Sequence, residues 1–220
     1  MKKDTKITAL FLLLCFMFTG IQAQEAHRRW RKMNTIRADK FDLILPEVMR
    51  ENKIEMWIVT NREGNYDPLY QDMGGGYTST NGYYVFTDPG SGRIERAALG
   101  MSGYLLEEGK VYDYVGSASE LADYVKQRDP KSIGLNYSKN FGGADGLSYS
   151  EYLELSELLG EKYKARFVSA EKLTSDFRSR RVASEIAVYG EAGELSYMIA
   201  EKAFSNEVIT PGVTTLEDVA

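Results

Sequence analysis

Short apolar runs that alternate with helical stripes constrain the fold of this chain more than any other feature of its sequence. The clearest run is Met56–Thr60, MWIVT, whose β-branched and aromatic residues are typical of a buried strand. Residues 82–87 and 94–99 are a second pair of strand candidates, joined by the turn signals of Asp88–Gly92. Further strands are expected at residues 111–115, 132–137 and 165–168.

Helical patterns separate these strands. One apolar face runs through residues 36–52 and carries Phe41, Ile44, Leu45, Val48 and Met49. Pro46 interrupts this stripe and predicts a kinked or restarted helix there. Ser148 and Glu151 have the spacing of a capping box at the start of another helix, and two more helices are expected at residues 119–128 and 170–177. The predicted fold class is α/β, with a mixed, largely hairpin-built sheet flanked by helices.

Residues 1–23 have the three parts of a secretory signal peptide. A lysine-rich start precedes the twelve apolar residues of Ile7–Phe18, and Ala23 supplies a small residue before the cut. Because a membrane-spanning helix needs roughly 20 apolar residues, we expect cleavage and export to the periplasm or the medium, with no stable membrane insertion. An uncleaved membrane anchor and lipidation at Cys15 are the alternatives.

The composition argues against several classes of protein. The chain has 220 residues, 27 of them basic and 32 acidic, so its net charge is −5 and we expect no nucleic-acid partner. It holds one histidine and one cysteine, which excludes a His-rich or Cys-rich metal cluster. The histidine, His27, lies in a basic stretch over residues 27–34 that we interpret as a surface arm. We therefore expect no catalytic residue, no metal ligand and no cofactor in this chain.

The loop after the first strand offers the best candidates for ligand contact. Asn61–Pro68, NREGNYDP, follows directly on a buried run, where a rigid scaffold positions the side chains. Arg62 can clamp a carboxylate through two hydrogen bonds, and Asp67 is the second substrate-side candidate. The alternative is that Arg62 pairs with Asp67 or Glu63 and only orders the loop. The glycine-rich segments 74–76 and 142–146 lack nucleotide-binding spacing, and we interpret them as connectors.

A second domain is expected to begin near residue 182. Arginines at 178, 180 and 181 form a basic linker, and Ser184 is the expected cap of a long helix that ends near Phe204. Two glycines on its apolar stripe indicate close packing against another element. Thr214 and Glu217 have the spacing of a second capping box. We expect domains at residues 24–181 and 182–220, the latter the start of a domain that continues beyond the chain.

Three segments in this order carry a family resemblance. The first is Ile54–Pro68, an apolar strand followed by Arg-Glu and Asp-Pro; the second is residues 178–192, RSRRVASEIAVYGEA; the third is residues 209–214, ITPGVT. Together they resemble the creatinase/prolidase/aminopeptidase P family of metallopeptidases, and most of all its exported bacterial Xaa-Pro aminopeptidase-like members. The chain departs from the family pattern at four positions, Arg181, Val182, Ala183 and Thr215.

The resemblance implies a creatinase/prolidase N-terminal-type domain followed by the first helix of a truncated pita-bread catalytic domain. It also implies that the full-length protein binds two divalent metal ions (Mn, Co or Zn) through residues beyond Ala220. Its partners would be a peptide substrate and a second copy in a homodimer. This chain would help to shape the substrate site and would be inactive alone. The alternatives are an exported binding module without chemistry and a creatinase-like hydrolase that is not a peptidase.

Overall fold

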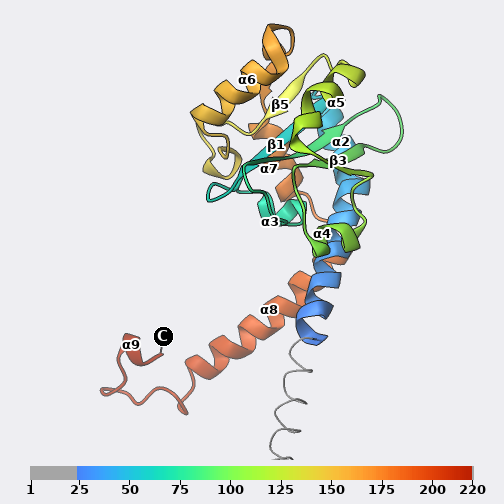
Figure 1. Ribbon diagram of the computed structural model, residues 1–220. Helices are drawn as coiled ribbons and strands as arrows, with labels where there is room; N and C mark the ends of the chain where they lie inside the picture. Colours follow the sequence, from blue (N-terminus) through green and yellow to red (C-terminus); the bar gives the residue numbers. More distant parts are fainter. Residues whose placement is uncertain (1–23, 220) are drawn as a thin grey trace, which may run out of the picture. The chain divides into compact units, whose positions relative to one another are not determined.

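The computed structural model describes residues 24–219 (Figure 1). The expected signal peptide, residues 1–23, lies outside the described part of the chain. The structure divides into two compact units, one that ends at Arg180 and one that begins at Arg181.

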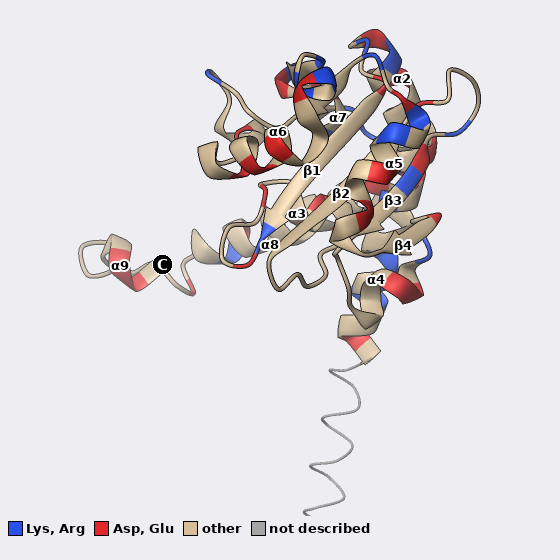
Figure 2. Cartoon of the chain, turned by 45° about the horizontal axis from the view of Figure 1, so that its top comes forward, with Lys and Arg blue, Asp and Glu red and all other residues tan. Residues whose placement is uncertain are grey.

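One six-stranded sheet organises the first unit, in the order β4-β3-β2-β1-β5-β6. Its strands are β1 (Met56–Arg62), β2 (Asn81–Thr87), β3 (Glu95–Leu99), β4 (Tyr114–Gly116), β5 (Ile133–Leu135) and β6 (Phe167–Ser169). All six strands were predicted, β1 two residues too short. Figure 2 shows that charged residues are concentrated on the helices and loops, whereas β1 and β2 are almost wholly uncharged.

The pairing of the strands makes the sheet mixed, as expected, but less hairpin-built than expected. β1–β2 and β2–β3 pair antiparallel, and β2 and β3 form the predicted hairpin. The pairs β3–β4, β1–β5 and β5–β6 are parallel. Parallel neighbours need crossover connections, and helices supply them here. Periodicity in the sequence marks each strand but carries no information about which strands pair, so the share of hairpins was overestimated.

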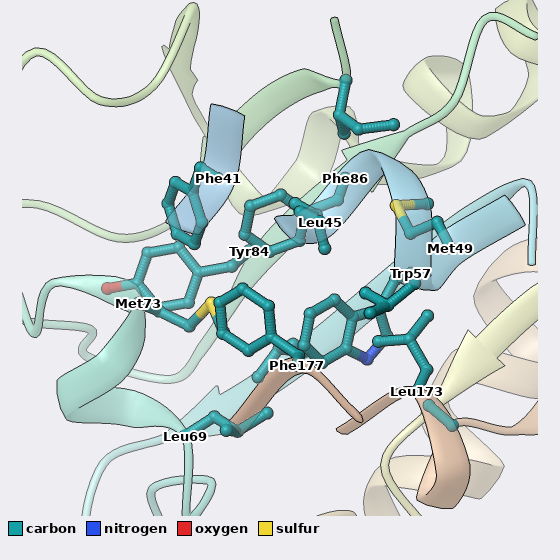
Figure 3. Close-up of a cluster of buried hydrophobic side chains, with 14 of the residues drawn as sticks. Phe41, Leu45, Met49, Trp57, Leu69, Met73, Tyr84, Phe86, Leu173 and Phe177 are labelled. Carbon is teal, nitrogen blue, oxygen red and sulfur yellow. The ribbon is translucent and has the colours of Figure 1, made fainter. Parts of the chain in front are cut away.

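Helices α2 (Leu45–Glu51) and α7 (Glu171–Ser179) cover one face of the sheet. Their side chains meet Trp57 and Phe86 in an aromatic core, with Phe41 and Phe177 packed beside them (Figure 3). A π-helical turn, Lys40–Ile44, precedes α2, and Pro46 lies in the first turn of α2. The interruption that the sequence predicts at Pro46 takes this form: a π-helical turn ends at Ile44, and Pro46 lies in the first turn of the α-helical segment that follows, where its missing N–H leaves no hydrogen bond unmade.

Helices α5 (Leu121–Arg128) and α6 (Tyr149–Lys164) cover the opposite face. Ser148 and Glu151 form the predicted capping box at the start of α6, each side chain bonding the backbone N–H of the other. Two short 3₁₀ segments, Ala118–Glu120 and Gly142–Ala144, lie before α5 and before α6. Because helices cover both faces, β1 and β2 are buried on both sides, which explains the continuous apolar runs 56–59 and 83–86 within them.

Three helical segments were not expected from the sequence: residues 24–35, which extend the helix expected from residue 36 towards the N-terminus, α3 (Tyr70–Met73) and α4 (Tyr104–Gly109). Residues 27–34 lie at the surface, as expected of a basic arm, and they are helical, which was not expected. Glu25 forms ion pairs with Arg28 and Arg29 one turn away, which stabilise a helix, and Asn34 donates to the carbonyl of Gly109 at 2.9 Å. The sequence did not indicate this helix, because its residues are mostly basic and polar and form only a narrow apolar stripe.

The second unit contains α8 (Ala183–Ala203) and α9 (Leu216–Val219). Both expected caps are displaced. Val182, not Ser184, is the N-cap of α8, and it makes no side-chain cap. Thr215 and Asp218 exchange the hydrogen bonds that were expected of Thr214 and Glu217. Although α8 has 21 residues and many apolar side chains, no helix in the described range 24–219 is long and apolar enough to cross a membrane.

Candidate functional site

The carboxyl ends of β1 and β5 lie side by side because these two strands are parallel neighbours. The chain leaves β1 towards β2, on one side of the sheet, and leaves β5 towards β6, on the other. A point where successive connections run in opposite directions is where open α/β sheets bind their ligands. The two residues that were singled out from the sequence, Arg62 and Asp67, both lie at this point. We call it the switch-point site.

Arg62 is the last residue of β1 and opens a tight turn. Its backbone N–H and carbonyl both bond to Asn65, at 3.1 and 2.9 Å, and Gly64 takes the left-handed conformation within the turn with φ of 77°. The guanidinium is exposed and donates to Glu154 of α6 at 3.3 Å. Its partner is thus neither Asp67 nor Glu63, the two considered from the sequence. Asn81 of β2 donates to the other oxygen of Glu154 at 2.8 Å.

Asp67 lies in the interior, with 3% of the residue exposed. One carboxylate oxygen accepts from the backbone N–H of Leu69 at 2.8 Å, and the other accepts from the side-chain amide of Asn136 at 2.9 Å. The backbone N–H of Asp67 donates to Asn61, also buried, at 3.2 Å. The structure therefore does not join the two candidates: Arg62 faces solvent, and Asp67 fastens the loop that follows it.

Two residues that sequence reasoning missed complete the buried part of the site. Asn136 directly follows β5, as the loop of Arg62 follows β1, and its side-chain oxygen accepts from the indole N–H of Trp57 at 2.7 Å. This bond fixes the orientation of the Asn136 amide, so that its NH₂ group points at Asp67. Thr174 of α7 lies near the same oxygen at 3.5 Å. A polar residue directly after a buried strand was the available signal for Asn136.

Gly146 explains why Asp67 is so completely covered. A side-chain carbon at position 146 would come nearest to the Asp67 carboxylate, 2.6 Å from its Cγ and 2.7 Å from Cδ of Pro68. Only a residue without a side chain lets the loop before α6 lie this close. The segment 142–146, interpreted as a connector, is in addition the lid over a buried carboxylate.

Burial changes the acidity of this carboxyl group. It raises the pKa of Asp67 from an ordinary 3.8 to about 6, against the hydrogen bonds from Leu69 and Asn136, which favour the charged form. The negative charge of Glu151 adds to the rise, and the positive charge of Arg178 opposes it. Asp67 therefore changes its charge near neutral pH.

A second concave surface lies beside helix 24–39. It is a groove of about 500 Å³ whose apolar walls include Trp30, Met33, Tyr77, Tyr104 and Leu105. The glycine segment 74–76 borders it, and tyrosine hydroxyls donate to two of its carbonyls, at Gly75 and Gly76. The groove is thus a formed surface with an aromatic wall.

The described residues 24–219 contain no group of three or more His, Cys, Asp or Glu side chains that could hold a metal ion. His27 stacks on Trp30 with 5.4 Å between the ring centroids. At the exposed part of the switch-point site, Arg62 and Asn81 supply hydrogen-bond donors, and Glu154 supplies acceptors. That combination can orient a polar, extended ligand.

No family model, curated protein or solved structure matches this chain.

Proposed function

We propose that this chain is the N-terminal portion of an exported aminopeptidase that uses two metal ions and acts on Xaa-Pro peptides. In this proposal the first unit shapes the substrate site, the second unit begins the catalytic domain, and the metal ligands lie beyond residue 220. The full-length protein would be a homodimer. The motif resemblance of residues 54–68, 178–192 and 209–214 motivates the proposal.

The observation that carries the proposal is the position of Arg62. It stands at the switch point of the sheet, its side chain is 41% exposed, and its partner Glu154 is 44% exposed. Exposed ion pairs contribute little to stability, typically about 0–1 kcal/mol, so this one can open at small cost. A guanidinium released from Glu154 can then bind the carboxylate of a peptide through two parallel hydrogen bonds.

Arg62→Ala in the complete protein tests this role. Loss of a contact made equally to the bound substrate and to the transition state raises KM and leaves kcat unchanged. We expect KM for an Xaa-Pro tripeptide to rise about tenfold, the size of one charge-assisted hydrogen bond. Arg93→Ala is the matched control, because Arg93 is also an exposed, ion-paired arginine but lies beside β3, paired with Asp113 at 2.5 Å. Equal KM values for the two variants would remove Arg62 from the substrate site.

The groove beside helix 24–39 favours a second candidate, an exported binding module without chemistry. Its aromatic wall and its volume of about 500 Å³ fit the general description of a ligand pocket. Isothermal titration of the full chain with short peptides, repeated with Tyr77→Ala, separates the two candidates. Binding that Tyr77→Ala abolishes and Arg62→Ala leaves intact would favour the binding module.

A further inference from the structure

The carboxyl group of Asp67 connects two loops of the first unit that are distant in sequence. Its own loop, residues 63–69, follows β1, whereas Asn136 and Gly146 belong to the loop between β5 and α6, residues 136–148. Asn136 in turn receives the indole N–H of Trp57 from the centre of β1. One side chain therefore holds both loops of the switch-point site together.

The ionisation state of Asp67 determines how strongly the closed arrangement of the two loops is favoured. In the closed arrangement the carboxylate accepts two hydrogen bonds but is removed from water, and burial is the larger effect on its ionisation. If the two loops separate, water reaches the carboxylate and this penalty disappears. The closed arrangement is therefore favoured most when Asp67 carries a proton.

The charged groups that face Asp67 do not change the conclusion that protonation of Asp67 favours the closed arrangement. Glu151 of α6 is a like charge, 1% exposed, and disfavours the ionised form of Asp67. Arg178 of α7 is the opposing charge, and it is itself paired with Asp72 of α3 at 3.3 Å. Asp145 lies in the same loop as Gly146, but it is exposed and accepts from the backbone N–H of Ser138 at 3.0 Å.

We propose that Asp67 is a proton-operated latch, which holds the loops 63–69 and 136–148 together over the carboxyl ends of β1 and β5 more firmly in mildly acidic solution than in neutral solution. Arg62 directly precedes the first of these loops and is bonded to its residue Asn65, so the latch also affects how firmly Arg62 is held against Glu154. The inference rests on the contacts of Asp67 and does not depend on which ligand Arg62 binds.

Hydrogen exchange on the full chain measures the latch directly. The pKa of Asp67 is 3.8 when the carboxyl group is solvated and about 6 in the closed arrangement. This difference predicts that the equilibrium constant for opening rises on the order of 100-fold between pH 4 and pH 8. We expect this rise, after correction for the intrinsic exchange rates, at the protected amides of residues 136–148. Asp67→Asn should reduce it to less than threefold, while Asp145→Asn, a neutralised carboxylate in the same loop, should retain it.

A second measurement keeps the proposal testable if Asp67→Asn fails to fold. The amide proton of Leu69 donates to the Asp67 carboxylate, so its NMR chemical shift in the unaltered chain should titrate with a midpoint near pH 6. A midpoint near 4 would overturn the proposal. An exchange rise that persists in Asp67→Asn, or a flat profile in the unaltered chain, would overturn it as well.

Discussion

A methyl group at position 146 should destabilise the first unit, because the loop before α6 packs directly on Asp67. In Gly146→Ala the added carbon would lie 2.6 Å from Cγ of Asp67 and 2.7 Å from Cδ of Pro68. Neither neighbour can yield cheaply: the Asp67 carboxylate is held by two hydrogen bonds, and a proline ring is rigid. The loop itself must therefore move outward.

The expected magnitude follows from two opposing effects. Overpacking a tightly filled site costs about 1–3 kcal/mol, and replacing glycine by alanine returns about 0.4–1 kcal/mol through the unfolded chain. The net loss in the free energy of unfolding is then about 1–2 kcal/mol. With a urea m-value of about 2 kcal/mol per M, the midpoint should fall by roughly 0.5–1 M.

Urea unfolding of the full chain, followed by the fluorescence of buried Trp57, is the assay. Gly142→Ala is the matched control, since Gly142 lies in the same loop and an added carbon there meets no atom within 4 Å. The control midpoint should stay within about 0.2 M of the parent value or rise slightly. If Gly146→Ala and Gly142→Ala unfold at the same urea concentration, the loop does not pack on Asp67 and the description of the buried site is wrong.

Three further predictions concern the same structure. Trp57→Phe should cost about 2 kcal/mol in urea unfolding followed by circular dichroism, because the buried Asn136 oxygen loses its 2.7 Å hydrogen bond and keeps only the 3.5 Å contact with Thr174. Trp30→Phe in helix 24–39 should cost less than about 0.5 kcal/mol, and equal losses would contradict the hydrogen bond from Trp57. Arg62→Ala should lower the free energy of unfolding by less than about 1 kcal/mol, and a loss above 2 kcal/mol would show that the pair with Glu154 is structural. Amides of residues 186–204 should exchange faster than those of β1 and β2, since α8 has no buried residue, and equal protection would place α8 in the first unit's core.

The elements of the sheet were predictable because their cause is local. β1 and β2 are buried on both faces, so each carries an uninterrupted run of four apolar residues, 56–59 in β1 and 83–86 in β2. The capping box at Ser148 was predictable for the same reason, since both of its partners lie within one helical turn. The restart at Pro46 follows from the chemistry of a single residue.

The partners at the candidate site were not predictable, because they are distant in sequence. Arg62 and Glu154 are 92 residues apart, and Asp67 and Asn136 are 69 residues apart. The sequence marks each of them as a polar residue near a strand or helix end, but only the parallel pairing of β1 with β5 brings them together. The same limit explains why Asp67 was expected to face a ligand and is instead enclosed.

The cap positions show a smaller limit of sequence reasoning. Ser and Thr patterns identify that a helix begins, yet neighbouring positions compete for the cap. At α9, Thr215 with Asp218 replaces the expected Thr214 with Glu217, because a shorter carboxylate three residues on serves equally well. At α8 no side chain caps the helix, and the backbone carbonyl of Val182 accepts the first bonds.

We propose above all that this chain contributes a substrate-shaping domain to a metal-dependent aminopeptidase. The most direct test compares two proteins, the 220-residue chain and the product of the complete gene, for release of the first residue from an Xaa-Pro tripeptide, each without added metal and with Mn²⁺, Co²⁺ or Zn²⁺. The account predicts turnover only by the complete product, abolished by a chelator and restored by the metal. Turnover by the 220-residue chain alone, or a complete product that is inactive with Mn²⁺, Co²⁺ and Zn²⁺, would contradict it.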